Sequence, residues 1–173
     1  MPWIPNQSND NSLQILSNVM NYSDLKVFVI EDDISVRSLL RRIMEKHFQI
    51  VIFEFGSPVS AFKAMGSALP DLIILDIHTP HISGFAAMQT IAANERLSAI
   101  PVVACTGDSE PELIKRLISL GVKEYILKPF DPQKLVDRLT VLFDEILEKK
   151  AKEVSDDEIN LITTEYDDDD ELV

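Results

Sequence analysis

Acidic side chains follow two of the apolar runs in this sequence of 173 residues. Glu31, Asp32 and Asp33 come directly after one run, and Asp76 comes directly after another. If the two runs form neighbouring strands of a parallel sheet, these carboxylates meet at one edge of the sheet and repel one another. A divalent cation removes that repulsion, and an all-oxygen site with open positions suits Mg²⁺. The residue types therefore predict a divalent-cation site where the two clusters meet.

The same acids have a second interpretation, in which they cap the helices that follow the strands. A helix is expected from about Val36, where apolar residues begin to recur at helical spacing, and Asp33 and Ser35 lie just before it. Side chains of these types accept hydrogen bonds from the first free amides of a helix. For Asp33 alone we favour this capping role over a role in metal binding.

Two further apolar runs end at groups that bind phosphate. Thr106 follows the run at residues 101–105, and Lys128 follows the run at residues 124–127. A hydroxyl and an ammonium both donate hydrogen bonds to phosphate oxygens. Phosphoryl transfer to an aspartate requires a carboxylate nucleophile with a metal, a lysine and a hydroxyl around it, because catalysis there is mostly positioning and charge neutralisation. The four strand ends thus outline a reaction site.

These groups meet only if the apolar runs form one parallel sheet. From Leu25 onward, short β-branched runs alternate with longer amphipathic stretches, which is typical of strands joined by crossover helices. The sequence therefore predicts the α/β class, with a five-stranded parallel sheet that is doubly wound and flavodoxin-like, in the strand order 2-1-3-4-5. The strands are expected at residues 26–30, 50–55, 71–75, 101–105 and 124–127.

Polar residues mark where the crossover helices begin. Ser83 opens the third helix, expected over residues 83–93, and the fifth helix is expected from about residue 132 to beyond residue 147. Gly121 favours the end of the fourth helix, because glycine readily adopts the positive φ of a helix stop. Three more residues are expected to begin helices. Ser57 and Asp131 each stand directly before a proline, and Ser109 stands three residues before Glu112.

Length and charge limit what the chain can be. The length suits one domain with a buried core, which we place at residues 25–150, between an N-terminal extension (1–24) and an acidic C-terminal tail (151–173). The extension carries an apolar subset that fits one side of a short helix, and the tail is expected to be largely disordered. The formal net charge of −13 disfavours direct binding to nucleic acid.

Four short motifs stand in order along the chain, each at the end of an expected strand. They are Val29-Ile30-Glu31-Asp32-Asp33, Leu75-Asp76-Ile77-His78-Thr79-Pro80 with Gly84, Cys105-Thr106-Gly107 and Tyr125-Ile126-Leu127-Lys128-Pro129-Phe130. In this order they resemble the response-regulator receiver family of two-component signalling, over roughly residues 25–147. The resemblance implies a magnesium-dependent phosphoacceptor switch that catalyses only its own phosphorylation and dephosphorylation.

Within this resemblance, Asp76 looks like the phosphoacceptor and Mg²⁺ like the cofactor. Glu31 and Asp32 look like the acids that bind the metal together with Asp76, and Asp32 is our preferred ligand for direct coordination. The backbone carbonyl of His78 would be a further ligand. A metal in this place would neutralise the charge of the transferring phosphoryl group.

The same resemblance assigns the parts of a switch. Thr106 would hydrogen-bond one phosphoryl oxygen, Lys128 would pair with another, and Tyr125 would change its packing as Thr106 moves. The peptide bond between Lys128 and Pro129 is expected to be cis, a form that costs little before proline. The surface that changes would comprise the fourth helix, the fifth strand and the fifth helix.

The expected partners are proteins. A histidine kinase or a histidine phosphotransfer protein would donate the phosphoryl group, and a downstream protein target would bind the switched surface. Since no output domain follows Leu147, the signal is expected to leave through protein contacts or through homodimerisation of the face between the fourth and fifth helices. No contact with nucleic acid or with a membrane is expected, and the absence of a signal peptide favours the cytoplasm.

Two other functions are weighed against this one. An aspartate-based phosphatase would also place a nucleophile at a strand end with magnesium, but that class requires a second aspartate where this chain has His78. A module that works without phosphorylation would normally have lost the acceptor, the lysine or the acids, and none is lost here. For His78 and Asp108 the choice stays open between tuning the phosphoryl lifetime, pairing with each other and simple solvation.

Overall fold

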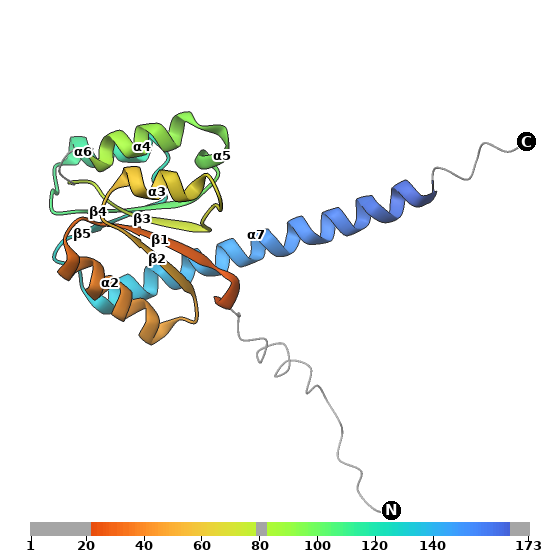
Figure 1. The fold of residues 1–173 in the computed structure, drawn as a ribbon, viewed down its shortest axis with the longest axis horizontal. Helices are drawn as coiled ribbons and strands as arrows, with labels where there is room; N and C mark the ends of the chain where they lie inside the picture. Colours follow the sequence, from red (N-terminus) through yellow and green to blue (C-terminus); the bar gives the residue numbers. More distant parts are fainter. Residues whose placement is uncertain (1–21, 79–82, 167–173) are drawn as a thin grey trace, which may run out of the picture.

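The sheet expected from the sequence is present in the structure, a computed structural model that describes residues 22–78 and 83–166, with residues 155–166 described by their backbone only. Its bounds are Lys26–Ile30 for β1, Val51–Phe55 for β2, Leu72–Asp76 for β3, Val102–Thr106 for β4 and Glu124–Leu127 for β5. The strands are parallel and pair in the order β2-β1-β3-β4-β5 (Figure 1). This order confirms the predicted doubly wound, flavodoxin-like fold.

Helices cover both faces of the sheet. Their bounds are Ile34–His47 for α2, Pro58–Met65 for α3, Gly84–Ala93 for α4, Glu95–Ser98 for α5, Pro111–Ser119 for α6 and Pro132–Tyr166 for α7, and a 3-10 turn, η1, spans Tyr22–Asp24. Helices α2 and α7 pack on one face, and α3, α4 and α6 pack on the other (Figure 1). The short helix α5 was not predicted, because four residues are too few to show a helical period.

The core consists of two apolar layers, one on each face of the sheet. Alternate residues of β1 point to opposite faces. Val27 and Val29 belong to the layer under α2 and α7, whereas Phe28 and Ile30 belong to the layer under α3, α4 and α6. Strands β3 and β4 are buried along their whole length, as expected of central strands covered on both faces.

The register of the strands brings four chain segments to one edge of the sheet. The pairs nearest this edge are Ile30–Leu75, Asp76–Cys105 and Thr106–Leu127. Asp76 and Thr106 are the last residues of their strands, one position beyond the predicted ends, because the ladder continues through them. Glu31 and Lys128 follow their strands directly. All four side chains therefore start from the same edge.

Most of the predicted helix starts are confirmed by hydrogen bonds. Ser57, Ser83 and Asp131 each accept a hydrogen bond from an amide in the first turn of the helix that follows. The prediction for Ser109 is wrong by one residue, since α6 begins at Pro111 and the cap position falls between them. The fixed φ of proline suits the first helical position, which explains the later start.

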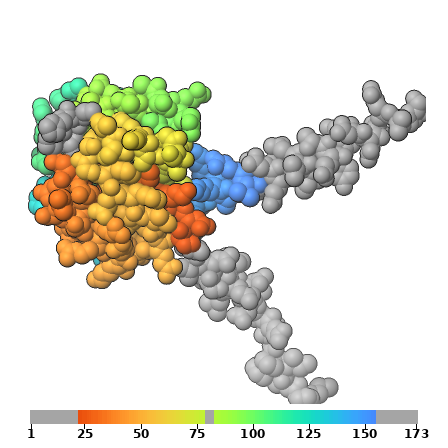
Figure 2. Space-filling view, viewed as in Figure 1, coloured from red at the N-terminus to blue at the C-terminus, as the bar shows by residue number. Residues whose placement is uncertain are grey.

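Helix α7 is longer than predicted. We expected a largely disordered tail from residue 151, whereas the backbone is helical to Tyr166, and Figures 1 and 2 show α7 leaving the folded body. An ion pair of 3.7 Å between Lys149 and Glu153, one helical turn apart, favours the continued helix. Lys150 also pairs with Asp71 at 2.6 Å and ties α7 to the segment before β3. Residues 1–21 and 167–173, and with them the predicted short N-terminal helix, lie outside the described residues.

Candidate functional site

Three carboxylates and a hydroxyl lie where the central strands end. Glu31 and Asp76 are 2% and 4% exposed and Thr106 is completely buried, whereas Asp32 is exposed. One ligand oxygen from each of the three acids lies within 4.8 Å of the other two. Burying like charges this close to each other is unfavourable without a counterion. Oxygen donors at this spacing fit a small divalent cation such as Mg²⁺.

Lys128 is a counterion that the chain itself supplies. Its Nζ lies 2.6 Å from Oε2 of Glu31 and 3.2 Å from Oδ1 of Asp76. The peptide bond between Lys128 and Pro129 is cis, as predicted. The sequence indicated that Lys128 reaches this edge, but the close pairing with Glu31 was not foreseen. The ammonium group therefore bridges one acid from each of the two acidic clusters.

The charges of this cluster shift the pKa values of its members. Burial raises the pKa of the Glu31 carboxyl, the hydrogen bond from Lys128 opposes that shift, and the nearby charge of Asp76 adds to it. For Lys128, burial alone lowers the pKa, but the hydrogen bond to Glu31 and the two carboxylate charges outweigh it, so the pKa is raised. The site therefore favours positive charge.

Asp33 and Arg37 hold the loop that carries the first acidic cluster. Oδ1 of Asp33 accepts hydrogen bonds from the amides of Ser35 at 2.7 Å and Val36 at 3.2 Å, which confirms the predicted capping role and lowers the pKa of Asp33. Nη1 of Arg37 donates to the backbone carbonyl of Glu31 at 2.5 Å. Arg37 was missed by the sequence analysis, because no motif marks an arginine that binds a backbone oxygen.

Gly84 allows α4 to approach the end of β3. A Cβ atom at this position would lie 1.9 Å from the carbonyl oxygen of Asp76 and 2.6 Å from Cα of Ile77. The amide of Gly84 donates to the carbonyl of Ile77 at 3.0 Å, so the contact is part of the hydrogen bonding that starts the helix. The glycine that belongs to the second motif thus sets the position of the Asp76 backbone.

His78, Thr106 and Asp108 form a small hydrogen-bonded group beside Asp76. Oγ1 of Thr106 lies 3.2 Å from Nδ1 of His78 and accepts a hydrogen bond from the amide of Asp108 at 3.0 Å. Nε2 of His78 lies 4.0 Å from Oδ2 of Asp108. The backbone amide of His78 donates to Oδ1 of Asp76 at 3.1 Å. The two rim residues left open by the sequence analysis are therefore connected, chiefly through Thr106.

These groups surround an open pocket of about 450 Å³. Its lining residues are Asp76, His78, Gly107, Asp108 and Lys128. The volume lies in the range of small-ligand sites, and the polar groups converge on one buried carboxylate. The pocket therefore gives a group outside the protein access to Asp76.

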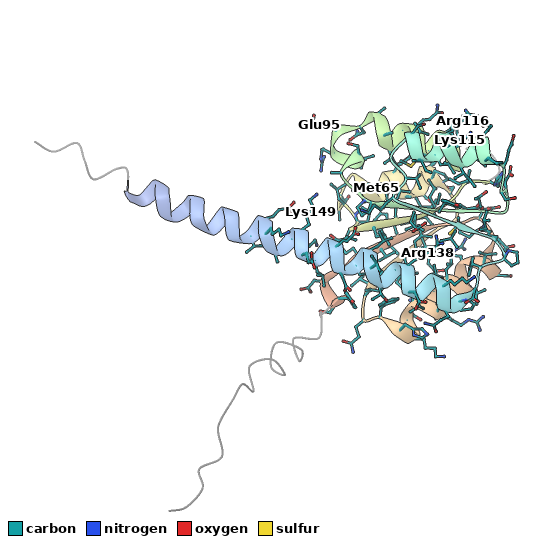
Figure 3. All side chains as sticks on the ribbon, turned by 180° about the vertical axis from the view of Figure 1, so that it is seen from behind. Met65, Glu95, Lys115, Arg116, Arg138 and Lys149 are labelled. Carbon is teal, nitrogen blue, oxygen red and sulfur yellow. The ribbon has the colours of Figure 1, made fainter. Side chains whose placement is uncertain are left out.

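Tyr125 lies on β5, partly buried against the layer that contains α3, α4 and α6. Its backbone carbonyl accepts a hydrogen bond of 2.9 Å from Nη1 of Arg138, which also pairs with Glu124 at 2.6 Å. Figure 3 labels Arg138 on the part of α7 that lies over the domain. Because β5 is an edge strand, this arginine binds one of the backbone groups that its open side would otherwise leave unpaired.

Comparison with known sequences agrees with this geometry. The family model described as the response regulator receiver domain matches residues 27–140. The phosphate regulon transcriptional regulatory protein PhoB of Escherichia coli is 32% identical over 130 residues, which cover 75% of this chain and 56% of PhoB. The sensor histidine kinase TmoS of Ectopseudomonas mendocina is 29% identical over 142 residues, which cover 80% of this chain and 14% of TmoS. The chain spans only 9% to 17% of the length of three curated relatives, one of which is TmoS.

A solved structure shows the same fold. The receiver domain of the sensor histidine kinase PA1611 from Pseudomonas aeruginosa, described with a magnesium ion coordinated in its active-site cleft, is 18% identical, with a TM-score of 0.62. The likeness covers 69% of this chain and 98% of that domain. In the described part of this chain, no helix combines the length and apolar character needed to cross a bilayer. Because the family match spans more than half of the sequence and the strand order agrees with it, the chain belongs to the response regulator receiver domain family of two-component signalling.

Proposed function

We propose that this receiver domain accepts a phosphoryl group on Asp76 and passes the signal on through a changed protein surface. The observation that supports this most directly is the place of Asp76, a residue that is only 4% exposed and yet lines the open pocket. Nζ of Lys128 lies 3.2 Å from its Oδ1. A buried carboxylate that faces a pocket beside a fixed cation is suited to attack phosphorus. The donor would be a phosphohistidine of a histidine kinase or of a histidine phosphotransfer protein.

In the transfer step, an oxygen of Asp76 attacks the phosphorus in line with the bond to the donor's imidazole nitrogen. The O–P bond forms as the N–P bond breaks, and the electron pair of the N–P bond returns to the imidazole, which takes up a proton. The chain contributes position and charge. The amide of His78 holds Oδ1 of Asp76 at 3.1 Å, Lys128 would pair with one phosphoryl oxygen, and Thr106 would donate a hydrogen bond to another.

Glu31, Asp32 and Asp76 would hold a Mg²⁺ ion, with the backbone carbonyl of His78 as a further ligand. When bound, the ion supplies positive charge to the oxygens of the transferring group. The three carboxylates within 4.8 Å support this assignment, as does the pairing of Lys128 with two of them. The magnesium ion described in the cleft of the PA1611 receiver domain supports the same choice of metal.

The surface that switches would comprise α6, β5 and the first turns of α7. An aspartyl phosphate adds close to two negative charges. Thr106 would turn toward them and Tyr125 would repack on the edge strand. A downstream protein would bind this face, or a second copy of the domain would. The formal net charge of −13 disfavours nucleic acid as the direct target.

The intact mass of the protein after incubation with acetyl phosphate tests this proposal. We expect the wild type to gain one phosphoryl group in the presence of Mg²⁺ and none in the presence of a chelator. Asp76→Asn, which is nearly isosteric, should gain nothing, whereas Asp137→Asn on the exposed side of α7 should behave like the wild type. Full labelling of Asp76→Asn would refute the assignment, and no labelling of the wild type would favour a module that works without phosphorylation.

A further inference from the structure

The side chain of Thr106 already has hydrogen-bond partners in this structure. Its Oγ1 is completely buried, 3.2 Å from Nδ1 of His78 and 3.0 Å from the amide nitrogen of Asp108. The contact with the ring exists only while the hydroxyl points toward the rim of the pocket. The proposed function requires the same hydroxyl to turn toward a phosphoryl group on Asp76. The resting contact and the switched contact therefore compete.

The competition does not depend on which ring nitrogen of His78 carries the proton. A hydroxyl has one proton to donate and two sites at which it accepts. The amide of Asp108 uses one accepting site, so the ring either takes the hydroxyl proton or donates to the second accepting site. In the first case the proton is withheld from a phosphoryl oxygen, and in the second the oxygen is held in place. In both cases, turning Thr106 toward Asp76 breaks the bond to His78.

The backbone of His78 is held beside the acceptor, and its ring lies at the exposed rim of the pocket. The backbone amide of His78 donates to Oδ1 of Asp76, which places this residue directly beside the acceptor. Its Nε2 lies 4.0 Å from Oδ2 of Asp108, on the same rim that supplies the amide to Thr106. The side chain of His78 is 53% exposed, so the ring has open space into which it moves when Thr106 leaves.

We propose that His78 is a positioning residue that holds Thr106 in its resting orientation. The inference rests on the proposed function and adds a threshold to it, namely the free-energy cost of breaking the Thr106–His78 hydrogen bond before the domain switches. On phosphorylation, Thr106 exchanges the His78 ring for a phosphoryl oxygen. The free energy of the lost hydrogen bond reduces the free energy by which phosphorylation favours the switched conformation. Loss of the bond therefore makes the domain easier to switch.

Two substitutions of His78 in the full chain test this role. Asparagine places a hydrogen-bonding atom near the position of Nδ1, whereas leucine has a similar volume and no such atom. Beryllofluoride, which mimics a phosphoryl group on a carboxylate, is titrated at saturating Mg²⁺, and the amide resonances of Gly107 and Asp108 are followed by NMR. We expect His78→Leu to bind about fivefold more tightly than the wild type and His78→Asn to bind like the wild type.

The Thr106→Ala background separates this role from a general change in the pocket. Without a hydroxyl there is no bond to break, so His78→Leu should then change the affinity for beryllofluoride by less than about twofold. An equal gain in both backgrounds would show that His78 acts on the pocket rather than on Thr106. That result would overturn the inference, as would a His78→Asn variant that behaves like His78→Leu.

The orientation of Thr106 in the free protein distinguishes failure of this inference from failure of the proposed function. Three-bond couplings across Cα–Cβ of Thr106 should report one rotamer in the wild type and in His78→Asn, and averaged rotamers in His78→Leu. If the wild type binds no beryllofluoride, both the phosphoacceptor proposal and the proposed role of His78 are wrong. A wild type that binds it, with identical Thr106 couplings in all three proteins, leaves the phosphoacceptor standing and removes the role of His78.

Discussion

At the residue scale, two cations share one set of carboxylates. Lys128 pairs with Glu31 at 2.6 Å and with Asp76 at 3.2 Å, and both acids are also in the set that would bind Mg²⁺. Glu31 is almost completely buried, so it needs a positive partner at all times. The lysine meets that need before a metal binds. Metal binding and the position of Lys128 are therefore expected to be linked.

Replacement of Lys128 by alanine tests this link. In a chelator, we expect Lys128→Ala to lower the free energy of unfolding by about 2 kcal/mol, because two buried carboxylates lose their counterion. Excess Mg²⁺ should restore more stability to the variant than to the wild type, since the ion no longer competes with the ammonium. Urea unfolding with and without Mg²⁺ measures both effects. Lys115→Ala, which removes an exposed ion pair with Glu112, serves as the control and should change little.

Gly84 and Gly107 offer a matched pair of glycines near Asp76. Gly84→Ala should destabilise the fold by about 2 kcal/mol, since the new Cβ would meet the carbonyl of Asp76 and overpacking at that level forces backbone shifts. Around Gly107 no atom lies within 4 Å of the new Cβ, so Gly107→Ala should stay within about 0.5 kcal/mol of the wild type. Thermal unfolding compares the two, and equal losses would contradict the close approach.

At the element scale, much of the fold could be predicted, because the spacing of apolar residues and the residues that end each strand can be recognised from short stretches of sequence. The places of Asp76, Thr106 and Lys128 follow from such signals. Helix α5 and the late start of α6 at Pro111 could not be predicted, because short segments and single caps are decided by tertiary contacts. The extension of α7 was missed because an acidic run resembles disorder, while ion pairs along a helix act against it. The contact of His78 with Thr106 depends on side-chain rotamers that no pattern specifies.

Tyr22 joins η1 to α7, and its pKa gives a measurable sign of that contact. Its hydroxyl donates to Asp144 at 2.6 Å, and burial, this hydrogen bond and the Asp144 charge raise the pKa of Tyr22 to about 12. In the unfolded chain the phenol ionises near its ordinary pKa of 10.0, so above that pH the unfolded state is favoured by losing a proton that the native state keeps. The stability due to Tyr22 is thus complete below pH 10 and is lost as the pH rises toward about 12.

Substitution of Tyr22 by phenylalanine tests this assignment. At neutral pH, Tyr22→Phe should cost about 1 kcal/mol, because Asp144 loses its hydrogen-bond donor. Between pH 10 and about 12, the stability difference between wild type and variant should shrink, since only the wild type contains this phenol. Urea unfolding across that pH range gives the difference. A difference that stays constant with pH would show that the Tyr22 pKa is not raised in the folded protein.

At the scale of the whole molecule, net charge acts on the approach of small donors. The formal net charge is −13, and the proposed acceptor lies in an acidic edge of the sheet, so an anionic donor such as acetyl phosphate is repelled. Salt shortens the range of this repulsion, from about 30 Å at 0.01 M to about 8 Å at 0.15 M. At saturating Mg²⁺, the initial rate of labelling by acetyl phosphate should therefore rise with ionic strength. A rate that does not change over this range would show that the negative field does not reach the site, and a rate that falls would show that the site attracts the anionic donor.

The length of α7 has a mechanical consequence. From Lys150, which is tied to Asp71, the helix continues to Tyr166, and at 1.5 Å per residue that span is about 24 Å. A tilt of only about 5° at Lys150 would displace the far end by about 2 Å, by the geometry of a rigid rod of that length. The second turn of α7 lies next to the strand that carries Tyr125, because Arg138 in that turn donates to the Tyr125 carbonyl. A small rotation of α7 inside the domain would therefore be amplified along the helix, and its far end would move by about the width of an atom, as the tip of a lever does.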